Sequence, residues 1–154
     1  MPQEVPLLDQ QHWRVYPAAL DPLPSHQPAQ IACDPPGWQI ELDRLEVSTG
    51  RCNYTLLEHP AQAAAPSGSS IAVELWHFDL AAPEPAQAHV AIFFGAALQW
   101  ETYLDIPRAG ALHQVRFAAT RDLAVGDPIR FHLHNHGQNS WLLSSARALI
   151  TLAP

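Results

Sequence analysis

Apolar and polar residues alternate with a period of two along most of the chain after residue 36. In the stretch 97–106 one face carries Leu98, Trp100, Leu104 and Ile106, and the other carries Gln99, Glu101, Tyr103 and Asp105. Such alternation is typical of a β-strand with one buried face. Seven further strands are predicted at 38–47, 52–58, 71–80, 88–94, 112–118, 128–135 and 140–152. Because the parity slips near Arg44, we expect a bulge in the first of these.

Glycine, proline and asparagine occur where these strands must end, and no stretch shows a convincing helical period. The chain is therefore predicted to be all-β: an antiparallel β-sandwich, jelly-roll-like, of about eight strands. Eight of the fifteen prolines lie in the first 36 residues. This density disfavours helices and central strands, so residues 1–36 are predicted to form an extended N-terminal arm and residues 37–154 the sandwich domain.

The strand at 128–135 carries the most unusual pattern, Arg-Phe-His-Leu-His-Asn-His at 130–136. Alternation places Phe131 and Leu133 on one face, which must be the core, and His132 and His134 on the other. If a short turn joins this strand to 140–152 as a hairpin, His134 faces Trp141 across the pair. The second face then becomes a solvent-exposed surface rich in histidine.

Imidazoles two residues apart on a strand can converge on one ion, and a third histidine would complete a copper or zinc site. We therefore expect transition-metal binding through surface histidines, with His132 and His134 as the pair and further ligands from His77, His89 and His136. For His77 there is an alternative to a ligand role. It has the same parity as Ile71, Val73 and Leu75, so its side chain is also expected to point inward as a hydrogen-bonded core residue.

Part of this region resembles two metal-binding families. The stretch 126–137 resembles the segment of cupredoxins in which a Gly-Asp turn leads into an F-x-L-x-N-x-G strand, with a copper-binding histidine shortly after that glycine, where Trp141 stands here. The pair His132-x-His134 resembles the histidine pair of cupins. No cysteine follows Cys52, and no acidic residue follows His134. The chain therefore lacks the late cysteine ligand of cupredoxins and the glutamate of cupins, and neither family is assigned.

The same face is open to a second interpretation, a non-catalytic carbohydrate- or protein-binding module. A platform that stacks a sugar ring or receives a partner's apolar side chain would then be formed by Trp141, Arg130 and Arg147, extended by Trp76 and Glu74. A third interpretation is a structural subunit of a homo-oligomer or filament, in which the N-terminal arm lies along a neighbour's sheet edge.

Composition and the absence of known motifs disfavour several classes of function. The eight basic residues are all arginine, and fifteen acidic residues bring the net charge to -7. An acidic chain without lysine offers neither a phosphate-loop lysine nor a Schiff-base lysine, and we expect no nucleic-acid partner. The sequence contains no run of 18 apolar residues, so it predicts no membrane-spanning segment. No nucleophile elbow, nucleotide loop or HExxH motif is present, so the protein is expected not to be an enzyme.

Two cysteines, Cys33 and Cys52, allow a single intramolecular bridge. A disulfide between them predicts a secreted or periplasmic protein, and two unpaired cytosolic thiols are the alternative. Residues 1–11 contain neither the basic region nor the apolar region of a signal peptide, so an exported form is expected to have lost its signal peptide. Abundant alanine, proline and arginine without lysine is typical of a bacterial protein from a GC-rich genome.

Overall fold

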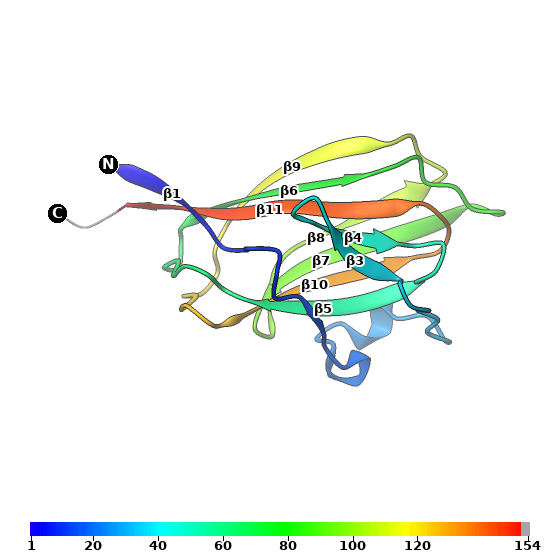
Figure 1. Ribbon diagram of the computed structural model, residues 1–154, viewed down its shortest axis with the longest axis horizontal. Coiled ribbons are helices and arrows are strands. Elements are labelled where there is room, and N and C mark those ends of the chain that lie inside the picture. Colours follow the sequence, from blue (N-terminus) through cyan, green and yellow to red (C-terminus); the bar gives the residue numbers. More distant parts are fainter. Residues whose placement is uncertain (152–154) are drawn as a thin grey trace.

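Two antiparallel sheets pack face to face in the computed structural model, which describes residues 1–151 (Figure 1). The first, sheet A, has the order β3-β4-β11-β6-β9, with β1 also paired to β11, and the second, sheet B, has the order β2-β5-β10-β7-β8. The strands are β1 Pro2–Pro6, β2 Arg14–Val15, β3 Trp38–Glu41, β4 Arg44–Ser48, β5 Tyr54–Pro60, β6 Ser70–His77, β7 Ala86–Phe94, β8 Ala97–Ile106, β9 Ala111–Ala118, β10 Pro128–Asn135 and β11 Ser140–Thr151. The predicted all-β sandwich is confirmed.

Seven of the eight predicted strands are observed with ends within three residues of the prediction. The first prediction, 38–47, is wrong in detail: the chain reverses at Leu42 and Asp43 and forms the hairpin β3–β4. Both turn residues have positive φ, 47° and 59°. A two-residue turn with two positive φ angles matches the twist of the flanking strands, which explains the slip of parity near Arg44 without a bulge.

The N-terminal segment packs on its own chain. Strand β1 pairs with β11, and β2 pairs with β5, so the segment adds a strand to each sheet (Figure 1). Leu7 and Trp13 are buried in the core. Beyond β2, two short 3₁₀ helices, η1 Ala18–Leu20 and η2 Pro24–His26, continue the segment on the side of sheet B.

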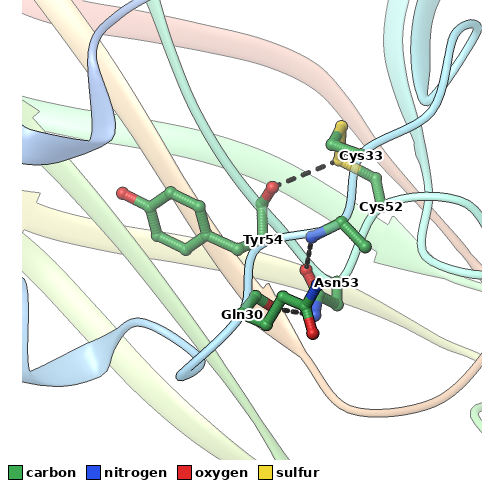
Figure 2. Close-up of a disulfide and its surroundings, with 6 residues drawn as sticks. Gln30, Cys33, Cys52, Asn53 and Tyr54 are labelled. Atoms are coloured by element: carbon green, nitrogen blue, oxygen red, sulfur yellow. Dashed lines mark hydrogen bonds between the residues drawn. A yellow bond between two sulfur atoms is a disulfide. The ribbon is translucent and has the colours of Figure 1, made fainter.

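The predicted disulfide between Cys33 and Cys52 is present (Figure 2). Next to it, Asn53 holds the incoming segment: its side-chain oxygen accepts the Ala32 N–H at 2.9 Å, and its amide donates to the Gln30 carbonyl at 3.0 Å. The bridge and these hydrogen bonds fix the end of the proline-rich segment to the start of β5.

The predicted pairing of 128–135 with 140–152 is wrong. Strand β10 pairs with β5 and β7 in sheet B, and β11 pairs with β4 and β6 in sheet A, so the turn between them crosses from one sheet to the other. The register of β11 against β6 also shifts between Leu143 and Ser145. This bulge inverts the alternation along β11, so that Trp141 and Leu143 face the core before it and Ala146 and Ala148 face the core after it.

The core lies between the sheets and contains the predicted inward residues of β10, Phe131 and Leu133. Trp141, Phe94 and Phe131 are its largest fully buried side chains. No helix within residues 1–151 has the length and hydrophobicity needed to cross a membrane.

Candidate functional site

His132 lies on the predicted face of β10, but the prediction that it is exposed is wrong, because its exposure is 0%. The N-terminal segment covers it. His132 Nδ1 lies 2.7 Å from the Asp21 carboxylate, and its Nε2 lies 2.9 Å from His89 Nδ1 on the neighbouring strand β7. His89 Nε2 lies 2.7 Å from the Glu101 carboxylate on β8. These four residues form a hydrogen-bonded chain from the buried interior to the partly exposed Glu101.

Counting hydrogens shows how this chain is charged. Its three contacts need three hydrogens, whereas two neutral imidazoles carry only two N–H groups. One extra proton is therefore held between two carboxylates. The Tyr54 hydroxyl donates a further hydrogen bond to Asp21.

The pKa shifts of three of these groups follow from their burial and their contacts. Burial lowers the pKa of His89, although the hydrogen bond to Glu101 works in the opposite direction. Burial works to raise the pKa of Asp21, but hydrogen bonds from His132, Tyr54 and the Leu23 N–H outweigh it, and the pKa lies below its ordinary value. Burial and the Asp21 carboxylate both raise the pKa of Tyr54, which stays a neutral donor.

The other three predicted histidines are not members of this hydrogen-bonded chain, although His134 lies opposite His89 across β10 and β7 and its ring contacts Tyr54. The His134 and His136 rings contact each other at 4.3 Å between centroids. His77 faces the core, as its parity predicted, and packs on Trp141 and His113. Sheet B separates His77 from the face that carries His132. The structure therefore does not gather the five histidines around one point, and metal binding by this set stays a prediction.

Trp141 and Arg130 do not form the predicted platform. Trp141 is 1% exposed in the core, and its indole N–H donates to Asn135 at 3.2 Å. Arg130 is held over the Tyr16 ring at 3.9 Å and donates to Glu58, which is also paired with Arg14. Both side chains are occupied within the protein.

Trp76 does lie on an outer face, that of sheet A. The register of β11, β6 and β9 arranges this face in three rows. The first row is apolar: Leu142, Trp76 and Leu112. The second row is polar: Ser145, Glu74 and Gln114. The third row consists of Arg147, Ala72 and Arg116, and its two arginines are cations. An apolar strip thus lies directly beside hydrogen-bonding groups.

These rows border two hollows of about 340 and 680 Å³, and Arg44 and Glu74 line both of them. Trp76 and the half-exposed Phe78 line the larger one. Their rings make an edge contact at 5.1 Å between centroids, and the Trp76 indole N–H donates to the Ser144 hydroxyl at 3.2 Å. We call the two hollows together the sheet A groove.

Sequence reasoning found Trp76, Glu74 and Arg147 but missed the rest of this groove. The alternation in β6 and β9 already places Glu74, Gln114 and Arg116 on outer faces. Their assembly around Trp76 depends on which strands are neighbours, and this does not follow from the alternation. A second group was also missed. Among residues 1–151, three potential metal-ligand atoms come within 4.8 Å of one another at Asp9, His12 and His59.

No known family model matches the chain, and no curated protein matches its sequence. Solved structures do resemble it. The C-terminal CBM6 module of a marine laminarinase from Zobellia galactanivorans is 11% identical, with a TM-score of 0.47 over 96% of this chain and 100% of that one. The second N-terminal cellulose-binding domain of β-1,4-glucanase C from Cellulomonas fimi is 15% identical, with a TM-score of 0.45 over 99% and 97%.

An adhesin domain of Lys-gingipain from Porphyromonas gingivalis is 13% identical, with a TM-score of 0.47 over 96% of this chain and 97% of that one. Several of the similar structures are thus carbohydrate-binding modules. Similarity at this level assigns neither a family nor a ligand, so the function is argued below from the residues of this chain.

Proposed function

We propose that the protein is a non-catalytic carbohydrate-binding module that holds a glycan in the sheet A groove. The observation that carries this proposal is the placement of Trp76 and Leu112 directly beside the polar row of Ser145, Glu74 and Gln114 along the sheet A groove. A pyranose ring has the same two-sided chemistry, with C–H groups on its faces and hydroxyls around its edge.

The aromatic part of the groove is fixed before a ligand arrives. The hydrogen bond to Ser144 and the contact with Phe78 hold the Trp76 ring in place. A rigid aromatic side chain loses little conformational entropy on binding, so more of its contact energy appears as affinity. Glu74 and Gln114 lie opposite each other on β6 and β9, where carboxylate and amide groups can exchange hydrogen bonds with sugar hydroxyls.

The charges of the groove favour a neutral glycan. Three cations, Arg44, Arg116 and Arg147, line it together with three anions, Glu4, Glu74 and Asp79. Arg147 and Glu4 already pair at 3.4 Å. With equal numbers of cations and anions the groove has no net charge to attract an acidic or sulfated glycan, whereas neutral hydroxyls can use both kinds of group. The disulfide supports export to an oxidising compartment, where such glycans are found.

Isothermal titration against a panel of neutral and acidic oligosaccharides tests this function. Trp76→Ala removes the stacking ring, and we expect it to weaken binding by about 30-fold or more, the cost of losing an aromatic hot spot. Arg116→Ala removes an exposed groove residue, and we expect it to weaken binding about 10-fold. Arg121→Ala is the matched control, because Arg121 is equally exposed but lies outside the groove.

Thermal melting of each variant separates lost binding from lost folding. The proposal predicts that Arg116→Ala keeps the melting temperature and loses affinity, while Arg121→Ala keeps both. Equal affinities for wild type, Arg116→Ala and a folded Trp76→Ala would contradict a site in this groove. The absence of binding to any glycan of the panel would contradict the function itself.

A further inference from the structure

Asp9, His12 and His59 bring two imidazoles and a carboxylate together outside the sheet A groove. Asp9 and His12 lie between β1 and β2, and His59 is next to last in β5. His59 Nε2 lies 2.6 Å from Asp9 Oδ1, and His12 Nδ1 lies 2.7 Å from Asp9 Oδ2. None of the three lines the groove proposed for glycans.

The two ring nitrogens of His59 have different roles, and the contact of Nδ1 with a carbonyl group determines the role of Nε2. Its Nδ1 lies 2.8 Å from the Pro60 carbonyl, which can only accept, so Nδ1 carries a hydrogen. In the neutral ring Nε2 then has no hydrogen and directs its lone pair at a carboxylate oxygen. The side chain is 0% exposed, so water cannot relieve this repulsion. The contact is satisfied by a hydrogen between the nitrogen and the oxygen or by a cation bound between them.

The same arrangement is the one that orients a metal-binding histidine: a backbone carbonyl holds one ring N–H, and the other nitrogen is left free to coordinate. Asp9 is held in turn, because its Oδ1 accepts the Gln11 N–H at 2.9 Å. Burial works to raise the pKa of Asp9, but this bond and the two histidines outweigh it, and the pKa lies below its ordinary value. The carboxylate is therefore ionised at neutral pH.

The group can also open to admit an ion. Tetrahedral bonds of about 2.0 Å place ligand atoms about 3.3 Å apart. The two contacts to Asp9 must therefore lengthen by less than about 1 Å, and the ligand nitrogens of His12 and His59, which lie within 4.8 Å of each other, must reach the same spacing. The side chains of His12 and Asp9 are 62% and 33% exposed, and both lie in a loop, where such a movement meets little resistance. A hollow of about 540 Å³ lined by His12 and His59 leaves room for a water molecule as fourth ligand.

We propose that Asp9, His12 and His59 form a binding site for a divalent transition-metal ion, with Zn²⁺ as the best match. Two nitrogens and one carboxylate oxygen suit Zn²⁺, whereas Mg²⁺ takes oxygen ligands in an octahedral arrangement. The site is independent of the glycan groove, and each proposal can fail without the other.

Competition titration of Zn²⁺ against a chromophoric chelator tests this site, with untagged protein that has been stripped of metal. We expect one Zn²⁺ per chain and no competition by Mg²⁺. His12→Ala and Asp9→Asn each remove one ligand, and we expect each to weaken binding by more than about 10-fold. Both positions are partly exposed, and asparagine keeps the oxygen that accepts the Gln11 N–H, so both variants should fold. His136→Ala is the comparison, because it removes an exposed histidine of the separate set that the sequence proposed as metal ligands.

A gain in melting temperature on adding Zn²⁺, present in wild type and His136→Ala but lost in His12→Ala and Asp9→Asn, would support the site. Equal Zn²⁺ affinity in all four proteins would overturn it. A loss of affinity in His136→Ala with none in His12→Ala would also overturn it, because the ion would then be bound by the histidines of β10.

Discussion

Trp76 and Trp141 lie on neighbouring strands of one sheet, yet one side chain lines the groove and the other fills the core. Simple alternation predicted the first correctly, because β6 runs without interruption from Ile71 to His77. It failed for the second because the bulge after Leu143 inverts the faces of β11. A single extra residue thus decides which tryptophan can meet a ligand.

His134 makes the stability of the fold dependent on pH. Burial, followed by repulsion from His136 and His132, lowers the pKa of His134 to about 4, and its Nε2 has no hydrogen-bond partner among residues 1–151. Tyr54 and the His26 backbone also face this ring. Between about pH 6.5 and 4 the unfolded chain takes up a proton that the folded chain does not, so stability falls as the pH is lowered.

Urea unfolding at pH 7, 5.5 and 4.5 measures this effect, with His134→Gln as the comparison. One proton corresponds to a slope of up to about 1.4 kcal/mol per pH unit in the free energy of unfolding. His134 is partly exposed, so we expect less than this limit. The wild type should lose more stability than His134→Gln over this range, and parallel losses would show that His134 does not titrate as described.

At the scale of elements, the alternation of β10 and the turn of β3–β4 show what local sequence can predict. The faces of β10 follow from its sequence, because the strand is regular from Pro128 to Asn135. The turn was missed because Leu42-Asp43 is an unusual pair at positions that need positive φ. Asparagine and glycine are the residues that such turns favour, and their presence would have signalled a hairpin.

Substitutions in this turn should therefore stabilise the folded protein. We expect the double substitution Leu42→Asn and Asp43→Gly to raise the free energy of unfolding by about 1 kcal/mol, because it relieves the cost of left-handed backbone in larger residues. Denaturant unfolding measures the gain. Leu42→Ala is the control: it removes the same 85% exposed side chain but keeps the unfavourable φ, and no gain is expected. An equal gain in both variants would assign the effect to the lost apolar surface.

At the scale of the molecule, the N-terminal segment joins both sheets and supplies Asp9 and Asp21 to histidines far along the chain. Asp9 meets His59 and Asp21 meets His132, contacts that span 50 and 111 residues. The sequence showed that the segment was extended and partly apolar. The sequence did not show these histidine partners, because a contact between residues far apart in the chain produces no pattern in the residues around either of them. Sheet membership of β10 and β11 was unpredictable for the same reason.

The disulfide holds the far end of this segment. The cysteines are 19 positions apart, and closing a loop of this size stabilises the folded state by about 3 kcal/mol on the chain-entropy model. Replacing both cysteines with serine should lower the free energy of unfolding by this order. The double variant avoids a free thiol, and urea unfolding of it under oxidising conditions gives the value. A loss below about 0.5 kcal/mol would mean that the hydrogen bonds of Asn53 suffice to hold the segment.

The five tryptophan indoles offer the most direct measurement of the central claim, that the outer face of sheet A binds a glycan. Each indole N–H gives its own signal in a ¹H–¹⁵N spectrum of labelled protein, and single substitutions assign them. We predict that titration with the best oligosaccharide of the panel shifts the Trp76 indole signal and leaves that of the buried Trp141 in place. Shifts confined to Trp13 or Trp100, with Trp76 unmoved, would contradict the account.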